Sequence, residues 1–258
     1  MWRYLRIDHL APAAVCIFCH RPLRSARGIV ITDGVQEAFA GPNCAKRMLG
    51  NPEERLLDVT QLALLVVSDQ DPGAPLASKA PPHDLIPQNG AEEGNRPPRP
   101  ALPPLDEVIQ YLRLRYEFMT AFRFHKSKLL TEAYEQFRAT GQLSDLQRRR
   151  VAGAIRNAAE QQSVFSVDNV MHCIGVDHWL KEAVEHTPAD RREFLEAMRR
   201  KLHRNWCLSV GQLEAINKWG ARLRLQVHSF PHLNIDVFQQ VHVPPFMQSN
   251  DQGNARHR

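Results

Sequence analysis

The stretch Cys16-Ile-Phe-Cys19-His20-Arg-Pro-Leu, completed by Gly41-Pro42-Asn43-Cys44-Ala-Lys-Arg, decides the fold expected for the first part of this chain. A Cys-x-x-Cys pair at the tip of a tight turn lets two thiolates reach one tetrahedral metal ion. Cys44 adds a third thiolate at the start of a predicted helix over residues 43–49. Zinc takes sulfur and nitrogen ligands in this arrangement, and four of them where its role is structural. We therefore expect a structural zinc module.

The fourth ligand of this module is a choice among three residues that spacing does not settle. His20 is preferred on chemical grounds over His9 and Asp33, although it follows Cys19 directly and needs the turn to bend back. A thioredoxin-like redox pair is disfavoured because that motif should follow a strand and open a helix, whereas a basic loop follows here. A chance occurrence is disfavoured by the third cysteine after Gly-Pro.

A hairpin with the Cys-x-x-Cys turn, followed by a ligand-bearing helix, is the treble-clef or ribbon pattern. Residues 28–34 predict a strand that ends in an Asp-Gly turn. So small a module buries little apolar surface, so that the metal would supply stability that the core lacks.

Composition bounds the class of protein. The chain has 258 residues and a net charge of +5, with no apolar run long enough to span a bilayer. We see no signal peptide at the start, so the odd total of five cysteines favours reduced thiols and metal binding in the cytoplasm. Cys173 and Cys207 fall in helical patterns and are expected to be small buried residues.

The composition divides the chain into four parts. Ten of the 18 prolines fall between Ser68 and Pro104, where large apolar residues are scarce, which predicts a linker. The expected fold class is mainly α, with a small N-terminal α+β zinc module and a C-terminal helical bundle. The predicted parts are a zinc-binding domain over 1–67, the linker over 68–104, the bundle over 105–222, and extended segments and a polar tail over 223–258, disordered from 247.

The predicted bundle contains a short internal repeat. Leu143-Ser144-x-x-Gln147 matches Leu208-Ser209-x-x-Gln212, 65 residues later, and each copy follows a basic amphipathic helix and precedes another helix. In such a capping box the hydroxyl caps a free amide at the helix start and the glutamine reaches back. We interpret the pair as a repeated helix–turn–helix hairpin, although two independent good caps would give the same match.

No catalytic set is recognisable in the sequence. There is no phosphate-binding glycine loop, no Gly-x-Ser-x-Gly elbow and no HExxH. His172 and Cys173 with Asp177 and His178 fit one helix and its packing better than a metal or nucleophile site. We therefore predict that the protein is not an enzyme.

Arginine-rich clusters make nucleic acid the predicted partner. Guanidinium groups on one side of several helices would follow a phosphate backbone. Any single cluster fits a solvated helix face slightly better, but four clusters beside a zinc module favour nucleic acid. The predicted contact residues are Arg24, Arg27, Lys46, Arg47, Arg123, Lys126, Lys128, Arg148, Arg149, Arg150, Arg199, Arg200, Lys201 and Arg204.

Cys16, Cys19 and Cys44, followed by helical segments from Leu105 to Arg222, resemble the large subunit of type IV CRISPR effector complexes. That family combines an N-terminal cysteine zinc module with a C-terminal helical bundle at about this length. The chain departs from the pattern at Gly41, which stands where a fourth cysteine is expected. Residues 16–47 equally resemble a short zinc-module family of plasmid and phage proteins with Gly-Pro-x-Cys at its second knuckle.

The first resemblance implies a non-catalytic subunit at one end of a guide-RNA-bound complex. It would read a short motif in duplex DNA beside the target and help to open the strands, while base pairing supplies sequence specificity. The implied partners are guide RNA, target DNA, the other effector-complex subunits and a separate helicase, with no membrane. The zinc module would brace the N-terminal domain.

Two other functions stay open. One is a plasmid- or phage-borne DNA-binding or regulatory accessory protein, with the zinc module as reader and the helices as a dimerisation domain. The other is an enzyme with a catalytic zinc, held by three protein ligands and an open water position. No glutamate is placed as in HxE…PCxxC deaminases, which disfavours the enzyme.

Overall fold

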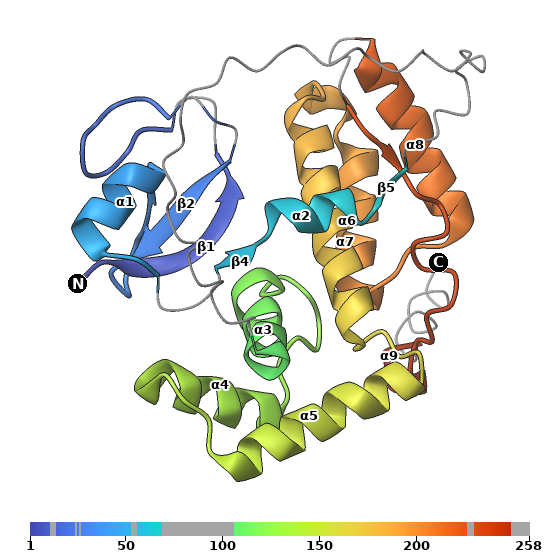
Figure 1. Cartoon of the computed structure of the whole chain (residues 1–258). Coiled ribbons are helices and arrows are strands. Elements are labelled where there is room, and N and C mark those ends of the chain that lie inside the picture. Colours follow the sequence, from blue (N-terminus) through green and yellow to red (C-terminus); the bar gives the residue numbers. More distant parts are fainter. Residues whose placement is uncertain are drawn as a thin grey trace, which may run out of the picture.

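The protein is mainly α-helical with a small sheet at its N-terminus, which confirms the expected fold class (Figure 1). None of the helices in the described ranges is both long and apolar enough to cross a lipid bilayer. The computed structural model describes residues 1–10, 14–23, 25, 27–52, 56–68, 106–225 and 230–248. The predicted linker therefore lies outside the described residues, apart from Ser68.

The N-terminal module is a four-stranded sheet with one helix. Its strands are β1 (Arg3–His9), β2 (Arg27–Thr32), β3 (Glu37–Ala40) and β4 (Leu57–Asp58), in the order β3-β2-β1-β4. β1 and β3 pair antiparallel with β2, and β4 runs parallel to β1. The β2–β3 hairpin, which turns at the predicted Asp33-Gly34, leads directly into helix α1 (Pro42–Leu49).

The segment after β4 belongs to the helical core. Helix α2 (Thr60–Leu64) packs on α6 (Val167–Glu185), and Leu62 and Val66 are buried among the side chains of the helices (Figure 1). Strand β5 (Val67–Ser68) then pairs with β6 (His232–Leu233) near the other end of the chain. Residues 57–68 thus join the sheet to the helices.

The helical part is built from two units of three helices. The first holds α3 (Glu107–Arg113) with its π-helical continuation (Leu114–Phe118), α4 (Lys128–Thr140) and α5 (Asp145–Glu160). The second holds α6, a 3₁₀ turn (Ala189–Arg191), α7 (Glu193–Asn205) and α8 (Val210–Arg224). A short helix α9 (Pro245–Gln248) follows.

The two units keep the 65-residue offset of the predicted repeat. α4 and α7 are both 13 residues long, and their first and last residues lie 65 positions apart. α5 and α8 also begin 65 positions apart. Each hairpin turns at a left-handed residue, Gly141 in the first and Trp206 in the second, and each places a buried leucine before its serine cap. The structure therefore extends the match from a short motif to whole helices.

The two caps differ in one detail. At Ser209 both halves of the capping box are present, since the Gln212 side chain accepts from the Ser209 amide at 2.9 Å. At Ser144 the hydroxyl accepts the Gln147 amide, but the Gln147 side-chain oxygen accepts from that same hydroxyl at 3.1 Å. The predicted capping box at Ser144 is therefore only half formed.

The tail differs from the expected extended segments. α8 continues to Arg224 because its apolar residues face α6 and the C-terminal segment, and the strand is confined to His232–Leu233. Met247, predicted to lie in a disordered end, is 4% exposed and belongs to the main core. Residues 226–229 and 249–258 lie outside the described residues.

Gly175 is expected to be indispensable where α2 crosses α6. A Cβ at Gly175 would clash sterically with the backbone carbonyl oxygen of Leu62 and would lie 3.1 Å from both methyl groups of Val66. Because backbone would have to shift, Gly175→Ala should lower the free energy of unfolding by about 1–3 kcal/mol. Chemical denaturation measures this.

The matched control is Gly153→Ala on α5, where a Cβ meets nothing within 4 Å. It should raise stability by up to about 1 kcal/mol, since alanine is the better helix former. Equal stability of the Gly175→Ala variant and the wild type would contradict the close approach of α2 and α6.

Candidate metal centre

Cys16 and Cys19 lie on a tight turn between strands β1 and β2. The Cys16 amide donates to the Arg21 carbonyl at 3.0 Å, and the His20 amide donates back to the Cys16 carbonyl at 2.8 Å. His20 adopts a left-handed conformation with φ of 55°, which closes the turn. An isolated antiparallel β-bridge between Val15 and Pro22 joins the two segments on either side of this turn.

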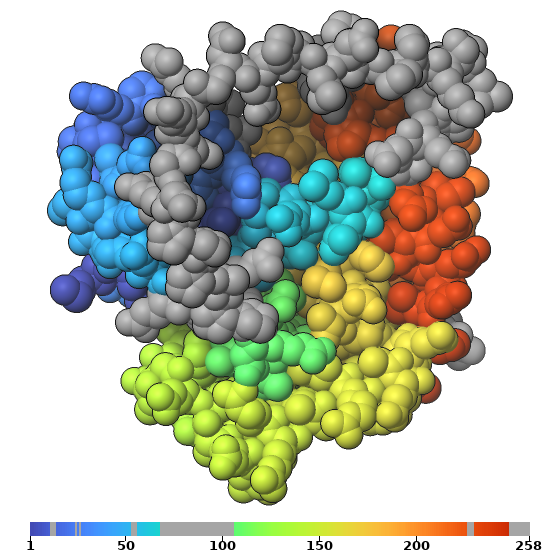
Figure 2. Space-filling view, in the orientation of Figure 1, coloured from blue at the N-terminus to red at the C-terminus, as the bar shows by residue number. Residues whose placement is uncertain are grey.

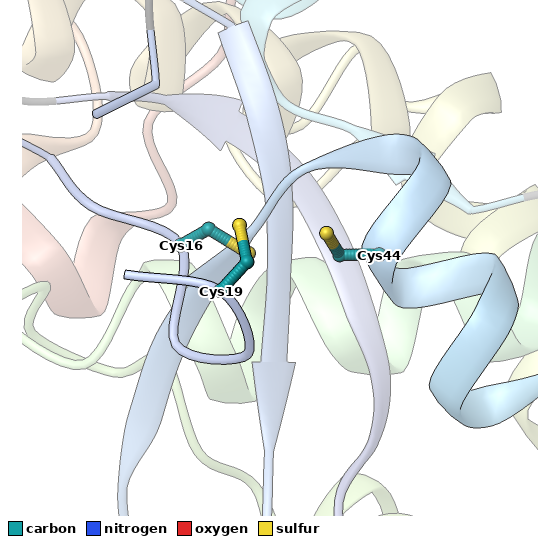
Figure 3. Close-up of side chains that lie close together, drawn as sticks. All are labelled: Cys16, Cys19 and Cys44. Atoms are coloured by element: carbon teal, nitrogen blue, oxygen red, sulfur yellow. The ribbon is translucent and has the colours of Figure 1, made fainter. Parts of the chain in front are cut away.

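Cys44 approaches this turn from the first turn of α1. The N-cap residue Gly41 is extended and Pro42 opens the helix, where no amide donor is needed. The Sγ atoms of the three cysteines all lie within 4.8 Å of one another, two from the turn and one from the helix (Figure 3). Thiolates on a tetrahedral zinc are about 3.8 Å apart, so that only a small adjustment separates this arrangement from a metal-bound one.

The cluster sits on a very small core. Cys16 is 1% exposed and packs with Ile31, Ala40 and Ala45, and no other residue is fully buried in this cluster of the described chain. Four small side chains bury too little apolar area to hold a module of this size unaided. A metal bridging turn and helix would supply the missing constraint.

The surroundings of the thiols suit a cation. Burial raises the pKa of the Cys16 thiol, but hydrogen bonds from the amides of Gly41, Cys19 and Phe18 outweigh it and lower that pKa to about 7. The pKa of Cys44 is raised, chiefly by its hydrogen bond to Cys19. The three thiols thus compete for negative charge, and a bound cation relieves this competition because it favours the thiolate at every ligand.

The structure brings together three of the four predicted ligands. His20, the preferred fourth ligand, is exposed and stays outside the group of close donor atoms. Asp33 instead accepts the amides of Val35 and Gln36 in the β2–β3 turn, both at 2.9 Å. His9 stacks on His178 with ring centroids 4.4 Å apart. None of the three candidates therefore completes the site in this conformation.

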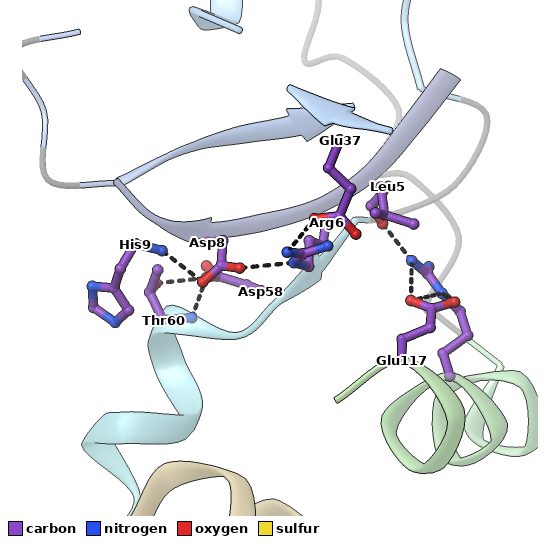
Figure 4. A network of polar contacts seen from close by, with 9 residues as sticks. Leu5, Arg6, Asp8, His9, Glu37, Asp58, Thr60 and Glu117 are labelled. Atoms are coloured by element: carbon purple, nitrogen blue, oxygen red, sulfur yellow. Dashed lines mark hydrogen bonds and ion pairs between the residues drawn. The ribbon is translucent and has the colours of Figure 1, made fainter. Parts of the chain in front are cut away.

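Polar contacts hold this module against the helices (Figure 4). Arg113 of α3, only 6% exposed, donates to the backbone carbonyl of Leu5 and pairs with Glu117 at 3.2 Å. Within the module, Arg6 pairs with Asp8 at 2.8 Å and with Glu37 at 2.7 Å. A buried guanidinium bound to a strand carbonyl fixes β1 relative to α3.

The predicted nucleic-acid contacts separate into two groups. Several are engaged within the protein: Arg27 pairs with Asp58, Arg148 with Asp106, and Arg199 with Asp177 at 2.6 Å. Arg200 lies 3.6 Å from Glu196, and the Arg123 guanidinium lies 4.5 Å from the Phe124 ring centroid. Arg24 lies outside the described residues.

The second group is exposed. Among the described residues its members make no ion pair, and they lie on α1, in the loop before α4, at the first residue of α4, on α5 and on α7. They are Lys46, Arg47, Lys126, Lys128, Arg149, Arg150 and Lys201. Arg204 is also exposed. The basic triplet over 148–150 is thus divided, with Arg148 tied to the cap of α3 and its two neighbours in solvent.

The residues His172, Cys173, Asp177 and His178 all lie on α6 and are buried or half-buried. Cys173 is fully buried and its thiol donates to the Trp206 carbonyl at 3.1 Å, and burial raises the pKa of that thiol well above its usual value. A protonated, inaccessible thiol is a poor nucleophile. Asp177 is held by Arg199 and His203. Cys207 is half-buried rather than fully buried.

Sequence reasoning missed the buried Arg115, which is 3% exposed and is the second residue of the π-helical turn. Its guanidinium lies 4.6 Å from the Trp206 ring centroid and 5.1 Å from that of Phe165. The spacing of Arg115 from apolar residues is the sequence signal that could have identified it as buried. Arg115 follows Leu112 by three residues and Tyr111 by four, which places it on the apolar stripe of α3.

Comparison of the chain with protein-family models, curated proteins and solved structures found no match.

The cysteine cluster generates a prediction about metal content. Cys44→Ser should remove most of the bound metal and lower the melting temperature by on the order of 5 °C, because turn and helix are no longer tied together. Gly41→Cys should bind the metal more tightly, since Gly41 has backbone angles that suit any residue and its amide lies 3.5 Å from the Cys16 sulfur. Elemental analysis and chelator competition measure both effects. Cys207→Ser is the control, and equal metal content in all variants would refute the site.

The His9–His178 stack generates a prediction about pH. Burial lowers the pKa of His178, with the His9 ring acting in the same direction, against raising contributions from Glu182 and Asp8. Its pKa is thus lower in the folded than in the unfolded chain, so the unfolded chain binds the proton first as pH falls through about 6.5. Stability should therefore fall as pH falls through that range.

Denaturation midpoints between about pH 7.5 and pH 5.5 test this. His178→Gln should lessen the loss of stability with acid, whereas His20→Gln, at an exposed position, should leave it unchanged. A His178→Gln variant with the pH dependence of the wild type would show that the stack does not contribute.

Proposed function

We propose that this protein binds nucleic acid through its exposed cations and that zinc stabilises its N-terminal module. The observation that supports this proposal is the second group of predicted contact residues, from Lys46 to Lys201. These basic residues are exposed and make no ion pair within the described ranges. Cations already satisfied by carboxylates contribute little to binding phosphates, whereas unpaired ones release counterions on contact. The net charge of +5 supports the same partner.

Zinc is the metal that the donor set favours. Three thiolates from a turn and a helix are soft ligands, which select zinc over calcium or magnesium. Cys16, Cys19 and Cys44 would hold the ion, and its chemistry there would be to cross-link the module. We assign the role of stabiliser because the cluster adjoins the smallest core of the described chain.

The particular form of this proposal is the large subunit of a type IV CRISPR effector complex. It rests on the resemblance in architecture, and the cysteine cluster followed by two three-helix units supports it. In that role the protein would be non-catalytic and would contact guide RNA, target DNA, the other subunits and a helicase. The protonated, buried Cys173 supports a non-catalytic role for that segment.

One observation favours the second candidate, a DNA-binding accessory protein that acts alone. α4 and α5 are joined by the four residues 141–144, with a left-handed glycine in the turn, which is the form of a helix–turn–helix hairpin. Such a hairpin can bind duplex DNA without guide RNA.

A pull-down of the tagged protein from its native host, with sequencing of the bound RNA, tests the assignment. We expect short RNAs that share a repeat-derived handle, together with several co-purifying subunits. Retained affinity for duplex DNA with no RNA and no partners would select the accessory protein. Failure to bind any nucleic acid at low salt would overturn the proposed function.

A further inference from the structure

We infer that the outer face of α5 is the surface that contacts nucleic acid, and that its partner is the groove and phosphate backbone of duplex DNA. This inference rests on the proposed function and assigns it to one helix. The face consists of Leu146, Arg149, Arg150, Gly153, Arg156 and Asn157.

α5 is the most open of the long helices. It buries only Val151 and Ile155 of its 16 residues, and these two lie on the side that contacts α3 and α4. Arg148, on the same side, pairs with Asp106 at the cap of α3 and so anchors the helix. In Figures 1 and 2, α5 and α4 form the lower edge of the molecule.

The counterpart helix α8 is more deeply buried than α5. α8 occupies the same place in the second unit but buries five of its 15 residues. Strand β6 packs on it, and Asn217 makes two hydrogen bonds to the backbone of Leu233, at 2.8 and 2.9 Å. Among the described residues, α5 has no equivalent of β6. The positions of α8 that match the α5 face, among them Glu214, Lys218 and Arg222, are also exposed, but they carry mixed charge.

The charges of the uncovered face suit a polyanion. Arg149, Arg150 and Arg156 are exposed and make no ion pair within the described chain. The acidic residues of α5, Asp145 and Glu160, stand at its two ends. The central turns thus present positive charge only, which complements phosphate.

Gly153 lies at the centre of this face. A glycine inside a helix costs about 1 kcal/mol relative to alanine, and here nothing within 4 Å of a Cβ requires its absence. The missing side chain would let another molecule approach the helix backbone closely. Asn157 lies one turn after Gly153, and Arg149 and Arg150 lie one turn before Gly153. Asparagine and arginine side chains form paired hydrogen bonds with base edges.

The helical shape of the surface selects duplex DNA over duplex RNA. The major groove of DNA, about 12 Å wide, admits an α-helix, whereas the deep, narrow groove of duplex RNA excludes side chains. A helix of 16 residues is about 24 Å long and can place two or more turns in the groove.

The test measures binding of the full-length protein to a short DNA duplex over a range of salt concentrations. Arg149→Gln with Arg150→Gln should weaken binding by about ten-fold or more at low salt and reduce the salt slope by about 2. Lys218→Gln with Arg222→Gln, on α8, removes the same charge and should change affinity less than about two-fold. Both pairs are exposed, so folding should be retained, and circular dichroism checks it.

A second variant, Gly153→Glu, places a carboxylate at the centre of the face. Glutamate is a better helix former than glycine, so stability should not fall while duplex binding is lost. If the wild type binds duplex DNA and the α5 variants bind equally well, the inference is overturned and the proposed function stands. Binding to single-stranded RNA but not to duplex DNA also overturns it, whereas binding to neither overturns the proposed function itself.

Discussion

The constraint on which the helical part depends is the buried guanidinium of Arg115. Among the described residues it has no carboxylate partner, and an unpaired buried charge is costly unless every donor is satisfied. Here the Tyr111 hydroxyl and two backbone carbonyls accept its hydrogen bonds, and the ring of Trp206 covers it. The two backbone carbonyls belong to Phe124 and His125, in the loop before α4. The charge therefore holds that loop in place and ties the first unit to the second.

Trp206 completes the connection from the other side. Its indole N–H donates to the carbonyl of Arg123, and its own carbonyl accepts from Asn169 and Cys173. This residue also ends α7 in a left-handed conformation, so that the turn of the second hairpin and the junction between units are one structure. These contacts hold the loop that leads into the α4–α5 hairpin, and they leave the outer face of α5 exposed.

The sequence was sufficient for features that depend on neighbouring residues. Cysteine spacing located the cysteine cluster, and serine caps located the starts of α5 and α8, because both are local signals. Partners distant in the chain were not predictable. Arg148 and Arg199 were predicted to be surface cations. In the structure Arg148 pairs with Asp106, 42 residues away in the chain, and Arg199 pairs with Asp177, 22 residues away. The same limitation hid the buried Arg115 and left His20 as the preferred fourth ligand, although His20 is exposed and lies outside the group of close donor atoms.

The pairing of β5 with β6 has a consequence for the integrity of the chain. Leu57, Val59, Leu62 and Val66 lie in the core of the helices, although they precede the proline-rich stretch. A peptide bond cleaved between residues 69 and 105 would therefore yield two fragments that remain associated, because each contributes side chains to the same interior. The protein should tolerate being produced as two separate polypeptides, and neither polypeptide alone possesses a complete core.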